Sequence, residues 1–451
     1  MHNRPLLDGF SEDLSPMLRP VEDATLLRSF MGDEMMPKET ASVGSLEEAS
    51  ETLKAANSQG LAVIPQGSGT MMGLGNLLRR ADVLLEVGGL RRVLEHNPEN
   101  LTVTTECGLS LGELREVLAE KGQFLPLDPP LSSATLGGII SCNASGPKRL
   151  IYGVCRDMIL GMKVILADGS VINSGGRCVK NVSGLDLCKL FIGSLGTLGV
   201  IAEATFKVHP LPEEEAIQVG WSSDAGEAFQ LCRSVIHSVL FPAALEILDP
   251  HLADLWCRQM GSQPTEKGWL TLLGWAGFAE DVRRCLRDGQ VIFRSHNMME
   301  GGVYSSDAAQ KGWEALGHLP QSLESPVGGP VCCRMCLLLD RLQEGAQRWQ
   351  EEVSQAGGRS ALSVRAGSGI LYGYLLDAHQ NPEASIQAVE RMRKWTVGMG
   401  GNLVVESAPV WLKKRVDVWG TTGKELILMK RLKAHFDPRD VLNPGKYVGG
   451  I

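Results

Sequence analysis

The sequence predicts an α+β fold made of two or three structural units. A chain of 451 residues is longer than a single domain, which averages roughly 100–200 residues. Short apolar strands and amphipathic helices follow one another along it, separated by glycine-rich segments. The pattern changes at Pro210 and Pro212, which precede the acidic run Glu213–Glu215, so we expect a domain boundary there.

Composition excludes several classes of function. The chain is 43% hydrophobic and 21% charged, which is ordinary for a globular protein in water. Its net charge of −8 speaks against a nucleic-acid binder, which would show a basic surplus. No apolar run reaches the roughly 18 residues of a membrane-spanning helix. The first residues, MHNRPLLDGF, lack the apolar core of a signal peptide.

The cysteines indicate the compartment. They number 11, an odd count that fits free thiols in a reducing cytosol better than a disulfide framework. We therefore expect a cytoplasmic protein. Cys332, Cys333 and Cys336 form the group CCRMC. An iron–sulfur cluster requires four thiolates at regular spacing, whereas this segment offers three inside an apolar run. We interpret it as a buried strand and predict no metal site.

The elements of the first half follow from caps and periodicity. Residues 1–35 are interpreted as an extension with little periodicity. The first helix begins where Ser45 precedes Glu48 in a capping pattern, and it ends near Gly60. The elements expected next are strands at 61–64, 83–87 and 101–106, a helix over 111–121, and a strand at 124–127.

The second half begins with a predicted hairpin, in which strands at 159–166 and 171–173 are joined by the turn Ala-Asp-Gly-Ser. A long β-rich run covers 198–209. Residues 216–405 mix strands and helices, and a final helix covers 426–436. The tail DPRDVLNPGKYVGGI follows, where prolines and glycines prevent a regular element.

The segment PQGSGT at 65–70 is the first along the chain with the features of a ligand-binding loop. Gly67 and Gly69 have no side chain to block an anion, and the backbone N–H groups around them can form a nest for phosphate oxygens. A Walker loop would end in Gly-Lys-Ser/Thr, and no lysine follows here. The Rossmann fingerprint is G-x-G-x-x-G, and the spacing GSGTMMG is one residue too long. Two interpretations of this segment stay open: a flavin-binding loop between two strands, and a tight structural turn.

Two further segments have the same character. The loop SSATLGGIISCNASG at 132–146 is small and nearly uncharged, whereas a packed core would demand larger apolar residues. The loop GSLGTLGVI at 193–201 has glycine on both sides of Thr197. Any one of the three loops is compatible with a purely structural role. Together, each beside a predicted strand, they indicate one long cofactor lying across them.

In order, the motifs PQGSGT…GN, ATLGG…NASG…YG…RD, GLDL…GSLGTLGVI and DP…VLNPGKY resemble the vanillyl-alcohol oxidase type of FAD-binding proteins over roughly residues 40–451. The tail DVWG…FDPRDVLNPGKYVGGI is similar to the smaller FAD-binding subunits of bacterial glycolate oxidases. The resemblance implies an FAD-binding domain of two α+β subdomains at 36–212 and an α/β cap domain at 213–405. It also implies a C-terminal segment, 406–451, that returns to the FAD site.

The resemblance further implies which residues touch FAD. The backbone of the first loop would cradle the pyrophosphate, the second loop would line the flavin ring, the third would hold the adenine, and the tail would reach the ring system. For Thr135 and Asn443 the alternative role is to cap turns. The implied residues are Gln66, Gly67, Ser68, Gly69, Thr70, Gly75, Asn76, Pro129, Thr135, Gly138, Asn143, Ala144, Ser145, Gly146, Val200, Ile201 and Asn443.

Some members of this superfamily tether the flavin through a histidine or a cysteine. The first loop contains neither, and Cys142 is the only thiol in the second loop. A buried cysteine usually serves as a small hydrophobic residue. We therefore expect FAD to be bound without a covalent bond.

A 2-hydroxy-acid dehydrogenase of this superfamily needs a cation for the substrate carboxylate, a base for the hydroxyl proton, and the flavin as hydride acceptor. In the larger, catalytic relatives a histidine-rich motif supplies a metal or a base, but the matching region here, SVRAGSGILYGYLL, contains no histidine. Arg334 and Arg365 are substrate candidates because a guanidinium is a planar fork for a carboxylate. A surface salt bridge is the alternative for either arginine. His435 is expected to pack on the final helix, and no general base is assigned.

Two hypotheses of different class follow from the resemblance. In the first, the chain is the FAD-binding subunit of a glycolate oxidase-like complex with a catalytic FAD subunit and an iron–sulfur subunit. Electrons would pass from the substrate-reduced flavin to quinone, with the partners holding the chain at the inner membrane. In the second, the chain is a self-sufficient dehydrogenase of a small 2-hydroxy acid such as D-lactate. A flavin-less scaffold subunit is a third alternative. The extension 1–35 is either a partner-docking arm or a disordered tail.

Overall fold

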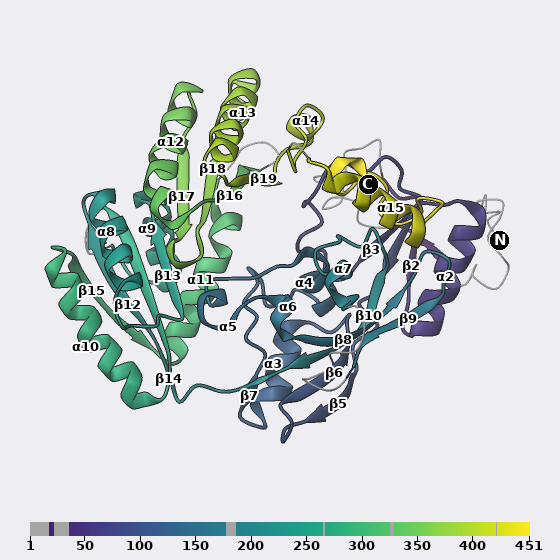
Figure 1. Cartoon of the computed structure of the whole chain (residues 1–451), viewed down its shortest axis with the longest axis horizontal. Coiled ribbons are helices and arrows are strands. Elements are labelled where there is room, and N and C mark those ends of the chain that lie inside the picture. The colour runs from purple at the N-terminus through teal and green to yellow at the C-terminus, as the bar shows by residue number, and fades with distance from the viewer. Residues whose placement is uncertain (1–17, 22–35, 177–185, 265–266, 325–328, 421) are drawn as a thin grey trace.

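The computed structural model describes residues 18–21, 36–176, 186–264, 267–324, 329–420 and 422–451. Two parts lie side by side (Figure 1). One holds a four-stranded and a five-stranded sheet together with the C-terminal helix, and the other is built on an eight-stranded sheet. The chain is therefore a mixed α and β protein, as the sequence predicts. Within the described residues, no helix combines the length and apolar character that crossing a bilayer requires.

The first sheet has the order β1 (Leu18–Pro20), β2 (Glu39–Ser42), β4 (Val83–Glu86) and β3 (Val63–Gln66). The expected first helix is confirmed as α2 (Leu46–Gln59). The Ser45 side chain accepts a hydrogen bond from the Glu48 N–H, and Gly60 ends the helix in the left-handed conformation. Strand β1 lies inside the predicted extension and pairs with β2. The rest of 1–35, apart from residue 21, falls outside the described residues.

The second sheet is antiparallel. It has the order β5 (Val93–Asn97), β6 (Thr102–Glu106), β10 (Val200–Lys207), β8 (Ile159–Ile165) and β9 (Val171–Gly175). The predicted hairpin is confirmed by the pairing of β8 with β9. Helix α3 (Leu111–Ala119) covers this sheet through buried leucines.

The strand predicted at 124–127 is wrong in position. The structure has β7 (Gln123–Phe124), which pairs with β11 (His209–Pro210). The Leu127 N–H donates to the Leu125 carbonyl at 2.8 Å, so the backbone turns where the sequence pattern suggests that it continues. Both leucines point into the core, and their burial explains the apolar pattern.

The third sheet is antiparallel throughout and has the order β15, β12, β14, β13, β17, β18, β16, β19. The group CCRMC lies within β16, so the expected buried strand is confirmed. The strands are β12 (Glu214–Ser222), β13 (Ala244–Leu248), β14 (Trp269–Gly277), β15 (Met299–Ser305), β16 (Val331–Cys336), β17 (Ser360–Arg365), β18 (Ile370–Leu375) and β19 (Asn402–Ser407).

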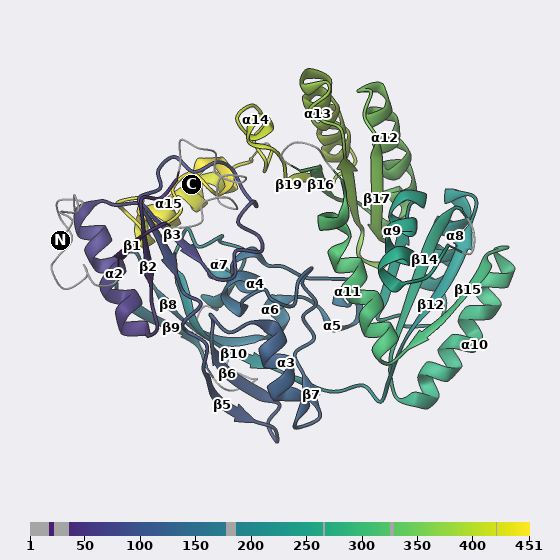
Figure 2. The same ribbon diagram turned by 180° about the vertical axis from the view of Figure 1, so that it is seen from behind.

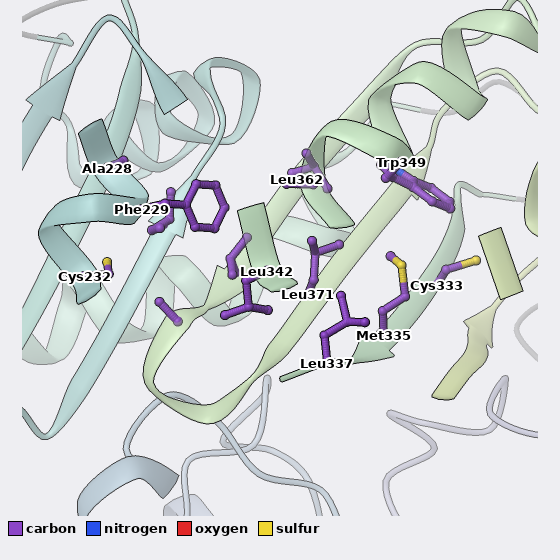
Figure 3. Close-up of a cluster of buried hydrophobic side chains, with 14 of the residues drawn as sticks. Ala228, Phe229, Cys232, Cys333, Met335, Leu337, Leu342, Trp349, Leu362 and Leu371 are labelled. Atoms are coloured by element: carbon purple, nitrogen blue, oxygen red, sulfur yellow. The ribbon is translucent and has the colours of Figure 1, made fainter. Parts of the chain in front are cut away.

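Helices cover both faces of this third sheet (Figure 2). One face packs against α8 (Ala225–Ile236), α10 (Ala279–Ser295), α12 (Leu342–Gln355) and α13 (Pro382–Gly398). Figure 3 shows this cluster, in which Trp349 of α12 packs against Gly373 of β18. The other face packs against α9 (Pro250–Met260) and α11 (Asp307–Ser322), but only over part of its width.

After the third sheet the chain returns to the first part through α14 (Val410–Lys413) and α15 (Glu425–Phe436). The final helix predicted at 426–436 is thus confirmed, and it begins one residue earlier, at Glu425. His435 lies on it and packs edge-on against Phe436, with 5.2 Å between the ring centroids. The tail then runs beside β3, where the Val63 N–H donates to the Val441 carbonyl at 2.8 Å.

Candidate functional site

The first glycine loop leaves the end of β3 and lies directly against the second segment. The Ser68 hydroxyl accepts a hydrogen bond from the Thr135 N–H at 3.3 Å. A Cβ atom added to Gly67 would lie 2.0 Å from Thr135 Oγ1. A side chain at position 67 is therefore incompatible with this arrangement, which explains the glycine without reference to a ligand.

From its small residues we expected the second segment to be a loop over its whole length. The structure differs from this expectation. The centre of this segment is the helix α4 (Leu136–Cys142). Thr135 caps this helix, since its hydroxyl accepts from the Gly138 N–H, and Asn143 ends it in the left-handed conformation. The small residues allow close packing instead: a Cβ at Gly137 would lie 3.1 Å from the Cys107 carbonyl. The capping role considered for Thr135 is confirmed.

The third segment is a tight turn that leads into β10. Leu195 adopts a positive φ of 52°, and Gly196 follows with 69°. The Leu195 N–H donates to the Ser141 carbonyl at 2.8 Å, which ties the turn to α4. From the tail, the Asn443 Nδ2 group donates to the Leu195 carbonyl at 2.7 Å. Asn443 therefore joins the tail to the third segment.

These three segments and the tail enclose one cavity. It takes in most of the first loop, the face of α4, the turn before β10 and two residues of the tail. The sequence-predicted residues that line it are Gln66, Gly67, Ser68, Gly69, Thr70, Thr135, Gly138, Ala144, Val200, Ile201 and Asn443. Segments that are distant in sequence thus converge on the single site that the motifs indicated.

The remaining predicted residues lie outside the lining of this cavity. Asn76 secures the tail: its Oδ1 accepts from the Val418 N–H at 3.0 Å, and its N–H donates to the Lys446 carbonyl at 2.9 Å. Gly146 packs against Asp128, whose Oδ1 accepts from the Gly146 N–H at 2.7 Å. The full set outside the lining is Gly75, Asn76, Pro129, Asn143, Ser145 and Gly146.

Two buried side-chain atoms in the cavity wall have no hydrogen-bond partner among the described residues. They are Gln66 Oε1 and Asn443 Oδ1. Leaving a buried acceptor unpaired costs about 1–3 kcal/mol, and a donor on a bound ligand is one way to remove that cost at a cavity wall. FAD carries N–H donors on its flavin and adenine rings. The unpaired acceptors therefore fit a polar, elongated cofactor of this kind.

Lys446 is the main lining residue to which the sequence analysis assigned no role. Its Nζ donates to the Met72 carbonyl at 2.7 Å, and burial lowers the pKa of this amine to about 8. Lys413 lies behind it and donates to the carbonyls of Gly73 and Gly75. Burial, together with the neighbouring Lys446, lowers the pKa of Lys413 to about 7. The motif NPGKY contains Lys446, but only the fold shows that its side chain reaches the cavity.

The substrate candidates lie on one face of the eight-stranded sheet. Arg365 pairs in register with Glu246 of β13, and Arg334 pairs with Tyr372 of β18. Arg334 Nε lies 2.6 Å from an oxygen of Glu406. These five residues form a polar row across the sheet, beside the area that α9 and α11 cover.

Arg365 connects this polar row to the cavity. Its Nη1 donates to the Ser145 carbonyl at 2.7 Å, and Ser145 follows Ala144, which lines the cavity. The guanidinium carbon also lies 4.9 Å from the centre of the Tyr372 ring. Of the two candidates, Arg334 is thus paired with a carboxylate, whereas Arg365 binds a backbone carbonyl and an aromatic face.

No group of three or more His, Cys, Asp and Glu side chains arranged for a metal occurs in the part of the chain that the structure describes. The cysteines of β16 cannot form such a metal site, because consecutive side chains of a strand lie on opposite faces of the sheet. Cys332 belongs to the cluster under α9 and α11, and Cys333 to the cluster under α12 and α13. Neighbouring strand residues point to opposite faces, so these two thiols do not converge.

Family models match both parts of the chain. Residues 37–175 match the FAD binding domain, and residues 212–447 match the C-terminal domain of FAD linked oxidases. The second match alone covers more than half of the chain.

Curated relatives align over most of the chain. The chain is 28% identical over 425 residues to the glycolate oxidase subunit GlcD of Bacillus subtilis, covering 92% of this chain and 89% of that protein. It is 27% identical to a mitochondrial D-lactate dehydrogenase (cytochrome) of Arabidopsis thaliana, covering 90% of this chain and 72% of that protein. A D-lactate dehydrogenase of Archaeoglobus fulgidus is 25% identical, with 89% of each chain covered.

Solved structures share the fold at low identity. An alkyldihydroxyacetonephosphate synthase aligns with a TM-score of 0.73 at 17% identity, over 95% of this chain and 82% of its own. A p-cresol methylhydroxylase aligns with a TM-score of 0.72 at 16% identity, over 96% and 94%. The architecture expected from the sequence motifs is therefore confirmed.

Proposed function

This chain belongs to the family of FAD-linked oxidases, and on this premise we propose that it is the FAD-binding subunit of a complex that oxidises a small 2-hydroxy acid. The names of its relatives support the substrate class. They refer to glycolate, D-lactate and D-2-hydroxyglutarate, and all three compounds carry a hydroxyl on the carbon next to a carboxylate. The shared chemical unit is thus a 2-hydroxy carboxylate.

The observation that carries this proposal is the position of Arg365. It comes from the eight-stranded sheet, yet its guanidinium lies 2.7 Å from the backbone beside the cofactor cavity. A carboxylate held by this fork would place the adjacent hydroxyl-bearing carbon near the cavity. Bound FAD would supply a hydride acceptor there. The chain's own residues bind and orient the acid.

We further propose that the chain holds FAD in the cavity without a covalent bond. The backbone of the first loop would receive the pyrophosphate, and Gln66 and Asn443 would accept hydrogen bonds from the rings. Cys142 is the thiol in the cavity lining, and no histidine is part of that lining. Burial raises the pKa of the Cys142 thiol to about 11, which leaves it protonated and a poor nucleophile near neutral pH.

The mode of attachment is tested by acid precipitation of the purified yellow protein. We expect the flavin to stay in the supernatant after the protein is removed by centrifugation. Flavin absorbance retained in the washed precipitate would contradict the proposal. The variant Cys142→Ser serves as the control that identifies the attachment point in that case.

A complex is favoured by two features. One relative is itself named a subunit, and the segment SVRAGSGILYGYLL lacks the histidines that the resemblance leads us to expect in the larger, catalytic relatives. In such a complex an iron–sulfur partner would carry electrons from the flavin to quinone. The second candidate is a self-sufficient dehydrogenase, which is favoured by the D-lactate dehydrogenase that aligns over 89% of both chains.

Anaerobic mixing with D-lactate or glycolate tests both candidates. The purified FAD-loaded chain and the complex isolated with its co-purifying subunits are mixed separately, and flavin absorbance is followed. We expect bleaching in the complex and none in the chain alone, because the chain would bind and orient the acid but its segment SVRAGSGILYGYLL offers no histidine to take the hydroxyl proton. Bleaching in the chain alone would replace the subunit proposal by the self-sufficient dehydrogenase. If neither sample bleaches although FAD is bound, the 2-hydroxy-acid proposal is overturned.

A further inference from the structure

The junction between the two parts of the molecule brings a second arginine to Arg365. Helix α5 (Arg149–Tyr152) follows the second cofactor segment and packs against β13 and the 3-10 turn η3 (Ala366–Ser368). The packing is close, since a Cβ at Gly367 would lie 2.5 Å from a methyl of Leu150. Figures 1 and 2 both show α5 between the two parts. Arg149 is the first residue of α5, and the charge of Arg365 at the end of β17 acts on it.

The arginines at this junction differ in their electrostatic surroundings. Arg334 is paired with Glu406, and Arg365 donates to a backbone carbonyl rather than to a carboxylate. Burial disfavours the charged form of Arg365, but nearby Tyr372 and the carboxyl groups around it raise its pKa. Arg149 forms no ion pair with any of the described residues. Glu246 lies opposite Arg365 in register, but its Oε2 is buried without a partner. Burial raises the pKa of Glu246 to about 8, so this carboxyl is mostly neutral near pH 7.

The neighbouring Asp128 does not neutralise these arginines directly. Its two carboxylate oxygens accept from the backbone N–H groups of Gly146 and Lys148, at 2.7 and 2.6 Å. Burial, followed by the charges of the nearby Arg365 and Arg334, lowers the pKa of Arg149. A partly buried cation without a counter-ion is costly. An anion placed between the two guanidinium groups would relieve this cost.

We propose that Arg149 and Arg365 together form an anion site that receives the carboxylate of the small acid. One arginine comes from the cofactor-binding part and the other from the eight-stranded sheet, so the bound acid links the two parts. Arg149 is thereby a substrate-binding residue. The inference rests on the proposed function for the identity of the acid, but the anion site itself requires no oxidation. The competing role for Arg149 is that of a surface arginine extended into solvent.

Two guanidinium forks without carboxylate partners have a further consequence. Each fork binds a carboxylate through two parallel hydrogen bonds. A dianion with two carboxylates matches both forks at once, whereas a monocarboxylate satisfies one of them. The site should therefore bind oxalate more tightly than acetate at equal ionic strength.

Oxalate is a suitable probe because it has no C–H bond and cannot transfer a hydride. The FAD-loaded chain is titrated with oxalate while the flavin absorbance spectrum and the melting temperature are followed. We expect a saturable spectral shift and a rise in melting temperature. Arg149→Gln and Arg365→Gln should each weaken oxalate binding about tenfold or more, since each removes a charged hydrogen-bonding partner.

Two controls separate this effect from general loss of charge or of folding. Arg359→Gln removes an exposed arginine next to the far end of β17, where it pairs with Asp377, and should leave oxalate affinity unchanged. Arg149→Lys keeps the charge but loses the planar fork, so its affinity should fall between those of the wild type and Arg149→Gln. Each variant is first checked for bound FAD and for its melting temperature without oxalate.

The outcomes distinguish the two proposals. If the wild type shows no saturable response to oxalate, or if Arg149→Gln folds, retains FAD and binds oxalate like the wild type, the anion site is overturned. If oxalate binds and both variants lose it, but D-lactate and glycolate never bleach the flavin in the chain or the complex, the anion site stands. In that case the proposed 2-hydroxy-acid oxidation fails.

Discussion

Gly67 shows how one residue connects the motif to the cavity. The sequence singled it out as part of a phosphate nest, and the structure adds that its Cα packs against the cap of α4. The 2.0 Å separation between an added Cβ and Thr135 Oγ1 is far shorter than any non-bonded contact. Either the loop or the helix would have to move, and both line the cavity.

We expect Gly67→Ala to weaken FAD binding. Overpacking of this kind costs about 1–3 kcal/mol, which corresponds to roughly a tenfold or larger loss of affinity if it falls on the cofactor-binding conformation. The measurement is FAD release by fluorescence during dialysis. Gly88→Ala is the matched control, because a Cβ at that position meets no atom within 4 Å. Equal FAD retention in both variants would show that the loop does not hold the cofactor.

Lys446 is a residue whose importance was not visible in its motif. A lysine in a glycine- and proline-rich tail is usually exposed, but here burial lowers the pKa of the amine to about 8. Its contact with the Met72 carbonyl joins residues that are far apart in the chain. Sequence spacing carries no information on such a pair, whose proximity depends on where the tail crosses β3.

At the scale of elements, α15 fixes the tail against the cofactor cavity. Lys433 on this helix donates to the Thr197 carbonyl, to Asp437 Oδ2 and to the Leu442 carbonyl, at 2.9, 2.6 and 2.8 Å. It thereby joins the third glycine segment, the turn after the helix and the returning tail. Lys433 and Asp437 are both buried, so this pair is shielded from water.

We expect Lys433→Met to lower the free energy of unfolding by about 3 kcal/mol, because it leaves the buried Asp437 without its cation and two carbonyls without a donor. Urea unfolding of the FAD-free chain measures the change. Lys430→Met, on the exposed side of the same helix, should change stability by less than about 0.5 kcal/mol. A similar loss in both variants would contradict the role of the buried pair.

Helix α4 is an element that the sequence analysis misinterpreted as a loop. Its glycines and serines suggested a loop, since glycine has low helix propensity. Tertiary packing overrides that preference here, because Leu136, Ile139 and Ile140 are fully buried and Thr135 caps the first turn. The capping threonine and the spacing of the apolar residues were signals in the sequence that identify this helix.

At the scale of the whole molecule, the cofactor cavity and the polar row belong to different parts that meet at α5 and η3. We propose the division into 36–212, 213–405 and 406–451 as the working domain scheme. The eight-stranded sheet begins with β12 at Glu214, and its last strand continues to Ser407, so the second boundary of this scheme moves from 405 to just after Ser407. The extension 1–35 contributes at least β1 to the first sheet, so a truncation series should start after that strand.

The sequence by itself determined the cofactor class and the local elements. Short sequence segments determine the local elements, because helix caps, turn residues and the alternation of apolar and polar side chains act directly on the backbone. Examples are the glycine loop, the capped helix α2, the hairpin of β8 and β9, and the buried strand of cysteines. The same segments contain the residues that surround the cavity, and the resemblance of their motifs to a family of FAD-binding proteins is what indicated FAD.

Only the tertiary structure decided how those windows combine. The enclosure of one cavity by residues from 64 to 446, the unpaired oxygens of Gln66 and Asn443, and the packing of α5 on β13 and η3 depend on strand register and on the packing of one part against the other. Such contacts join positions that share no local pattern. Their energies come from burial and from the pairing of charges, and these exist only once the chain is folded.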